Sequence, residues 1–134
     1  MGLTSTQADA FLNVFRGTTY TGFTSYVALF NGDPQGAGSE ITSTITGAAT
    51  RNAAGFGAPG AGTGDQRKIS NSAEISITAS AAGSATADYF AIYDAATGGT
   101  LRFSGALTSS LAISAGSPVK FEAAALKVII DPEV

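Results

Sequence analysis

The chain is patterned mainly for β-strands. In residues 73–78, Ala and Ile alternate with Glu, Ser and Thr, which predicts a strand with one solvated face. The run Tyr26–Phe30 is apolar at every position, so we expect a central strand that is covered on both faces. About eight such segments, separated by closely spaced turn residues, predict an all-β, antiparallel β-sandwich. We expect it to be jelly-roll-like, although the pattern also allows an immunoglobulin-like topology.

The stretch from Tyr89 to Leu107 predicts a hairpin. Two apolar strands flank Asp94–Gly99, whose composition suits a type I turn that is closed by a glycine in the left-handed region. After Leu107 the polar residues Thr-Ser-Ser predict a corner. Further strands are expected at residues 119–122 and 126–130, and Ile41 and Ile45 indicate a short polar strand.

One helix is predicted at the N-terminus, at about residues 4–16. Residues 4–6 (Thr-Ser-Thr) supply N-cap hydroxyls, and Gly17 supplies a stop. Phe11, Val14 and Phe15 form an apolar stripe at helical spacing, and Leu12 widens it. A helix this short needs a partner surface. We expect the stripe to pack on the chain's own sheet, and the alternative is docking against another subunit.

Residues of about 47–66 are rich in Gly and Ala and contain one large apolar side chain, Phe56. Such a segment has little apolar surface to offset the entropy of ordering its backbone. We therefore expect a flexible loop that could order against a neighbouring subunit. The length of 134 residues predicts a single β-sandwich domain over residues 1–134.

The composition removes several function classes. The chain has no cysteine and no histidine, which excludes Ser-His-Asp triads, thiolate nucleophiles and the ordinary zinc sites. Charged residues make up 13% of the chain and the net charge is -3, so we expect no nucleic-acid binding. No run is apolar enough for a membrane span, and no signal peptide is evident, so we expect synthesis in a cytoplasm without membrane association.

Two carboxylate pairs are candidate sites. Asp33 and Glu40 flank a Gly-rich loop and could attract a hard cation, but their spacing does not match an EF-hand. Asp88 and Glu122 are a pair that a carbohydrate-active enzyme could use, although the chain has no tryptophan platform for sugar stacking. We expect no catalytic residues, no cofactor and no metal.

Several motifs resemble a known group of proteins. They recur in order along nearly the whole chain: Leu3-Thr4 with 15–21 (Phe-Arg-Gly-Thr-Thr-Tyr-Thr), 26–30 (Tyr-Val-Ala-Leu-Phe) with Asp33-Pro34, 69–73 (Ile-Ser-Asn-Ser-Ala), 90–101 (Phe-Ala-Ile-Tyr-Asp-Ala-Ala-Thr-Gly-Gly-Thr-Leu), 105–107 (Gly-Ala-Leu), and Ala115-Gly116 leading to Phe121. The chain thereby resembles small β-rich structural proteins of tailed bacteriophages, which include capsid cement or decoration proteins and tail-fibre or minor tail proteins. It differs from them in lacking a proline after Thr21-Gly22 and in having a longer Ala58–Gly64 loop.

The resemblance implies a non-enzymatic virion protein. The leading hypothesis is a capsid cement protein on the capsid exterior, with the major capsid protein and further copies of itself as partners, a dimer being favoured. A tail-fibre or baseplate component for host attachment is the alternative, and a small carbohydrate-active enzyme is a third. Tyr20, Phe23 and Phe56 are the predicted interface residues, because each is an aromatic in a weakly structured stretch. Equally, they could cap their own sheet.

Overall fold

Antiparallel strands make up most of the computed structural model, which describes residues 2–47, 50–79 and 83–130. The N-terminal half contains β1 (Gly2–Leu3), α1 (Ser5–Phe15), β2 (Tyr26–Asn31), β3 (Ser39–Glu40), α2 (Thr42–Thr46), β4 (Asn52–Ala53) and β5 (Gly60–Ala61). The C-terminal half contains β6 (Arg67–Ser70), β7 (Ile75–Thr78), β8 (Ala85–Tyr93), β9 (Leu101–Ile113), β10 (Pro118–Phe121) and β11 (Lys127–Ile130). The predicted fold class, an all-β sandwich with one short N-terminal helix, is confirmed.

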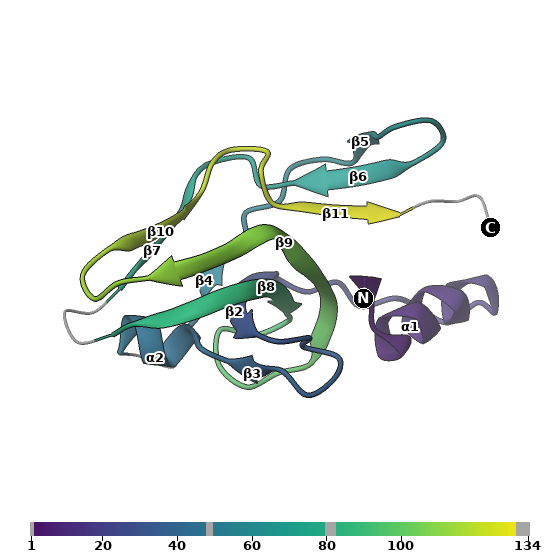
Figure 1. The fold of residues 1–134 in the computed structure, drawn as a ribbon. Coiled ribbons are helices and arrows are strands. Elements are labelled where there is room, and N and C mark those ends of the chain that lie inside the picture. Colours follow the sequence, from purple (N-terminus) through teal and green to yellow (C-terminus); the bar gives the residue numbers. More distant parts are fainter. Residues whose placement is uncertain (1, 48–49, 80–82, 131–134) are drawn as a thin grey trace.

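The largest sheet is built around β2 and β8. Its strand order is β1-β9-β8-β2-β3, and β4 also pairs with β2. Val27, Ala28 and Leu29 of β2 are completely buried, which confirms the prediction of a central strand covered on both faces. Figure 1 shows this sheet curving beneath the smaller sheets of the C-terminal half.

β8 and β9 form the predicted hairpin, but β9 is longer than expected. It runs as one strand to Ile113, so the chain makes no turn after Leu107. The corner predicted there is instead a bulge, because residues 107–110 stand opposite Asp88 alone, between the pairs Tyr89–Ala106 and Ala87–Leu111. The extension stays paired because residues 111–113 face residues 85–87 of β8 in an antiparallel ladder. A register shift between Ala87 and Tyr89 joins the two paired regions, and Thr108 is of a residue type enriched in strands.

Two smaller sheets complete the sandwich. β7 pairs with β10, and β5, β6 and β11 form a three-stranded sheet in which β11 is an edge strand. The alternation predicted for the β7 region is confirmed, because Ile75 and Ile77 are buried while Ser76 and Thr78 are exposed. Buried Asn71 links these sheets: its amide nitrogen donates to the carbonyl oxygens of Ala73 and Glu122, both at 2.8 Å.

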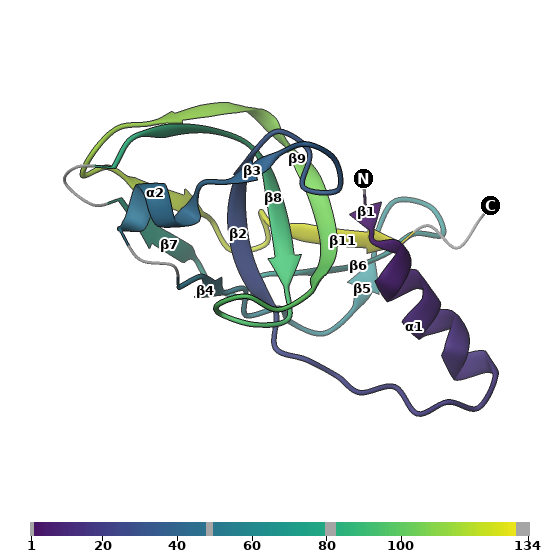
Figure 2. The same ribbon diagram turned by 90° about the horizontal axis from the view of Figure 1, so that it is seen from below.

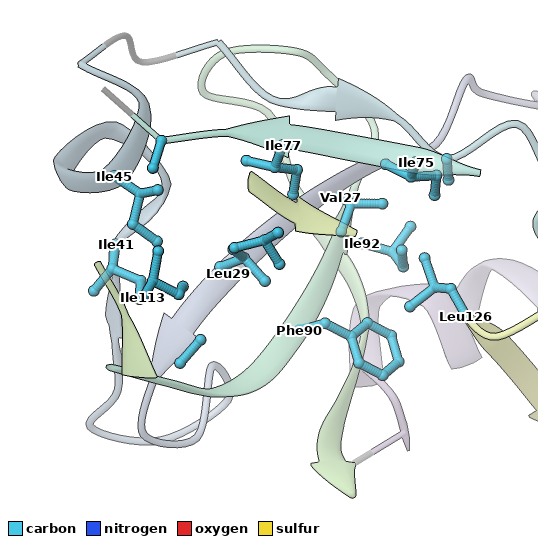
Figure 3. Close-up of a cluster of buried hydrophobic side chains, with 14 residues drawn as sticks. Val27, Leu29, Ile41, Ile45, Ile75, Ile77, Phe90, Ile92, Ile113 and Leu126 are labelled. Atoms are coloured by element: carbon cyan, nitrogen blue, oxygen red, sulfur yellow. The ribbon is translucent and has the colours of Figure 1, made fainter. Parts of the chain in front are cut away.

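The main hydrophobic core lies between the large sheet and the β7–β10 pair. Figure 3 shows Leu29 of β2, Ile77 of β7 and Ile113 of β9 pointing toward one another, with Phe90 and Leu126 at the other end of the cluster. A second, smaller cluster of Ala28, Phe30 and Ala91 covers the opposite face of β2 and β8. The large sheet is therefore buried on both faces at its centre.

The short strand predicted from Ile41 and Ile45 is wrong. This region is the helix α2, and both isoleucines belong to the main core. Their four-residue spacing places them on one face of a helix, and Gly47 ends the helix in the left-handed region at φ 72°. The Oγ1 atom of buried Thr42 accepts the Leu29 backbone N–H at 3.0 Å, which ties α2 to β2.

The bounds predicted for the N-terminal helix are confirmed. Thr4 is its N-cap, and the Thr4 Oγ1 atom accepts the Gln7 backbone N–H at 3.2 Å. At the other end, Gly17 at φ 87° donates to Val14 O and Thr18 donates to Asn13 O, which is a Schellman motif. The expected packing on the sheet is largely wrong, because Gln7 is the only fully buried residue of α1.

The Gly/Ala-rich segment at about 47–66 carries local structure. It contains β4 and β5, and Phe56 forms an isolated antiparallel bridge with Asn71. Residues 48–49 of this segment lie outside the described residues. Its flexibility stays a prediction. In the described part of the chain, no helix is long and apolar enough to cross a lipid bilayer.

Candidate functional site

Helix α1 is attached to the sandwich through its first turn. The Thr4 backbone N–H donates to Arg102 O of β9 at 3.1 Å, and the Thr4 hydroxyl donates to Leu101 O at 3.0 Å. These bonds fix the start of the helix against β9. The rest of α1 extends away from the sheets, as Figure 2 shows.

Gln7 connects the helix to two other segments. Its side-chain oxygen accepts a hydrogen bond from Arg102 Nη1 at 3.1 Å, and its side-chain nitrogen donates to the Tyr20 hydroxyl at 2.8 Å. Gln7 is only 2% exposed, so both polar ends of its amide need these partners. The amide therefore fixes the helix, β9 and the segment that follows the helix relative to one another.

Arg102 is itself held by the hairpin turn. Its Nη2 and Nε atoms donate to Asp94 Oδ2 at 2.7 and 3.2 Å. The Thr100 backbone N–H donates to Asp94 Oδ1 at 2.7 Å, and together with Arg102 it holds the pKa of Asp94 below its usual value. The Asp94 carboxylate is therefore charged at neutral pH, and it orients the guanidinium that meets α1.

The three aromatic residues predicted as interface residues line one cavity at the base of α1. This cavity has a volume of ≈ 100 Å³, and Tyr20, Phe23 and Phe56 all contribute to its wall. All three are half-buried. The Tyr20 ring lies 5.6 Å from the Phe11 ring, and the Arg102 guanidinium lies 5.0 Å from the centre of the Phe23 ring. They thus contact their own chain, and their contact with a partner stays a prediction.

A second cavity continues from the first along the inner side of α1. It measures ≈ 190 Å³ and lies between the helix and strands β6 and β11. The two cavities share the apolar residues Leu3, Phe11, Ile69 and Val128. We call the larger one the α1 groove. Ile130 at the end of β11 also lines it, and 41% of this side chain is exposed.

The outer part of the helix carries a large apolar surface, which we call the α1 face. It consists of Phe11, Leu12, Val14 and Phe15, whose exposed fractions are 37%, 63%, 48% and 90%. Helix α1 contains a single charged residue, Asp9. Sequence reasoning found these side chains, but it placed most of them against the chain's own sheet.

Asp88 and Glu122, the second candidate pair, lie in different parts of the fold. The Asp88 carboxylate accepts the Gly32 backbone N–H at 2.7 Å, which holds the loop after β2. Glu122 is an exposed residue immediately after β10, in a different sheet. The structure does not bring the two carboxylates together in one cleft.

Asp33 and Glu40 also have local roles. Asp33 Oδ1 accepts the Gln35 backbone N–H at 2.9 Å, and both oxygens of Glu40 are bonded to Arg51. Across residues 2–47, 50–79 and 83–130, no three His, Cys, Asp or Glu residues gather as a metal site. These acids thus stabilise loops and strands.

Sequence reasoning missed the cluster around Arg51. The Arg51 Nε and Nη2 atoms each donate to Glu40 at 2.9 Å, and Nη1 donates to the backbone carbonyls of Ala95 and Gly98 at 3.0 and 2.7 Å. Its guanidinium stacks 3.7 Å from the centre of the Tyr93 ring. Burial and then the Glu40 carboxylate raise the pKa of the Tyr93 hydroxyl, and Arg51 opposes this rise. Arg51 thus fixes the Asp94–Gly99 turn through two of its backbone carbonyls.

One comparison with known families covers almost the whole chain. The sequence model of the family described as "Podophage GP4 fiber I protein gp80" matches residues 2–129, which is all but the first residue and the last five. No curated protein shows a significant match. The chain therefore belongs to the podophage GP4 fiber I protein family, and it is a structural protein of a bacteriophage virion.

Proposed function

We propose that this protein is a subunit of a fibre on the phage tail, and that it acts by binding other virion components and not by catalysis. The observation that carries the proposal is the family match over residues 2–129, because that family is described as a fibre protein. The capsid-cement prediction, with the major capsid protein as partner on the capsid exterior, is untested by the structure. The family description fits a tail-fibre protein at least as well as a capsid cement protein.

The chemistry of the described residues supports a binding role. Of the candidate acids, Asp33 and Asp88 accept backbone N–H groups, Glu40 is bonded to Arg51, and Glu122 is exposed. A large apolar surface is available instead on α1. Exposed apolar patches of this kind usually mark a contact with another protein.

Locating the protein in purified particles tests the proposal. Heads and tails are separated, and each fraction is probed with an antibody raised against the purified chain, while intact particles are labelled with the same antibody and gold. We expect the protein in the tail fraction and gold at the tail. Label spread over the capsid facets would contradict the fibre role and support cement, and absence from both fractions would contradict either role.

A phage with an amber codon in this gene gives an independent test. Particles grown without suppression should keep heads that withstand chelator and mild heating, and they should adsorb poorly to the host. Heads that rupture under these conditions, combined with normal adsorption, would contradict the fibre proposal.

A further inference from the structure

The α1 face is comparable in area to the largest apolar patch of a typical monomer, and such patches are often functional. Its four side chains, together with Ile130, expose on the order of 500 Å² of apolar surface. The largest continuous patch on a typical monomer is about 300–600 Å² and is often functional. The α1 face together with Ile130 therefore lies in the upper half of that range.

The length of the helix also indicates a partner. Isolated helices shorter than about 12–15 residues are marginal in water, and α1 has 11. Its caps and the Gln7 amide fix its first turn and its end, but Phe15 in the last turn is 90% exposed. Leu12, Val14 and Phe15 stay exposed although Asn13 of the same turn is half-buried beside residues 18–21, so a second surface that covers these three side chains would stabilise the projecting half.

The size of the patch matches a standard interface. Such an interface buries about 800 Å² on each partner, of which about 57%, or roughly 450 Å², is apolar. The α1 face and Ile130 supply this amount, and Phe11 and Ile130 line the same groove. The scarcity of charge on α1, with Asp9 alone, is also typical of the centre of an interface.

We propose that the α1 face docks against the α1 groove of a second copy of this chain. The face carries projecting side chains and the groove is a recess of ≈ 190 Å³. Both lie on the same side of the molecule and share Phe11. A surface that holds both a projection and its recess can meet its own copy about a two-fold axis, so that each helix enters the other groove.

Self-association brings the two cations of the groove, Arg67 and Lys68, to the edge of the contact. The apolar centre is then Phe15 of one copy against Leu3, Ile69 and Val128 of the other. The inference deepens the proposed function, since it names the partner of a fibre subunit, and it is tested on purified protein without reference to the virion.

The first measurement is the mass of the purified full chain in solution, by light scattering or sedimentation, at concentrations up to about 0.1 mM. We expect about 27 kDa, twice the 13.3 kDa of one chain. Phe15→Ala should weaken the association by at least about tenfold, as for an anchor residue. Because Phe15 is exposed, its loss leaves the fold intact, which circular dichroism checks.

Leu111→Ala is the matched control. Leu111 is also a large exposed side chain, at 42%, but it lies near the C-terminal end of β9, on the side of the molecule away from α1 (Figures 1 and 2). This variant should associate like the parent chain. A monomeric parent chain, or an equal loss of association in both variants, would overturn the inference. Either result would leave the fibre proposal standing, because the position in the virion tests that separately.

The absence of cysteine allows a direct test of the contact. Leu12→Cys protein is mixed with Ile130→Cys protein and treated with a short bifunctional maleimide. A cross-linked product that contains one of each chain is expected. If the protein is dimeric but this pair gives no more product than Leu111→Cys mixed with Ile130→Cys, the dimer uses another surface and the inference is wrong.

Discussion

Removing the Arg51 guanidinium should destabilise the fold strongly. Arg51→Met keeps much of the aliphatic volume but deletes the four hydrogen bonds to Glu40, Ala95 and Gly98 and the stacking on Tyr93. It leaves the Glu40 carboxylate, only 28% exposed, without its charged partner. Breaking a buried pair by removing one partner costs about 3–5 kcal/mol.

That loss is large compared with the stability of a domain, which is about 5–15 kcal/mol. At about 3–5 °C per kcal/mol for a chain of this size, the melting temperature should fall by roughly 10–20 °C. Urea unfolding followed by circular dichroism, with calorimetry as a second probe, measures both quantities. The double variant with Glu40→Gln should recover part of the loss, because no charge is then left unpaired.

The exposed pair Lys120–Glu74 provides the control. Its side chains are 50% and 43% exposed and its atoms lie 3.5 Å apart, so Lys120→Met should cost less than about 1 kcal/mol. If Arg51→Met costs no more than Lys120→Met, the Arg51 cluster does not hold the turn, and the reasoning above is refuted.

Three further outcomes are expected, each measured by urea unfolding. Gly99→Ala should cost about 2–3 kcal/mol, because the new Cβ would lie 2.5 Å from Asp94 Oδ1. Gly98 is also at positive φ but has open space around it, so Gly98→Ala should cost only about 1–2 kcal/mol. Equal costs would refute the packing argument. Asp94→Asn should be less stable than the parent at neutral pH, and the difference in free energy of unfolding should shrink as pH falls. The lowered pKa of Asp94 means that its charged form stabilises the fold above the unfolded-state pKa of about 3.9, and this stabilisation is lost as pH drops through the folded-state pKa. A difference that stays constant to pH 2 would contradict this. Gln7→Leu should cost about 1–3 kcal/mol because two half-buried polar partners, the Tyr20 hydroxyl and the Arg102 guanidinium, lose their bonds to the buried amide. Asp9→Ala on the exposed side should cost less than about 0.5 kcal/mol, and equal effects would contradict the role of Gln7.

Local signals in the sequence predicted local structure well. The hydroxyls before α1 and Gly17 after it define the helix because capping depends on residues within a few positions. The β8–β9 hairpin is equally local. By contrast, the four-residue spacing of Ile41 and Ile45 fits one turn of a helix as well as a strand, and only the tertiary contact with Leu29 decides between them.

The parts of the candidate site that could not be predicted depend on contacts between distant residues. Arg51 bonds to carbonyls 44 and 47 residues away, and Arg102 meets Gln7 across 95 residues. Amphipathic spacing shows that Phe15 is on an apolar stripe, but it does not show what covers that stripe. The sequence therefore identified the aromatic residues at the base of α1 but not their common cavity.

Cryo-microscopy of the intact particle tests the central claim most directly, namely that this virion protein is a fibre subunit that binds through α1. We predict that the sandwich fits density in a fibre at the tail, and that Phe15 of each copy is covered by the groove of a neighbouring copy. Density for the chain on the capsid lattice would contradict the fibre role. An α1 face that remains open to solvent in the assembled particle would contradict the docking role.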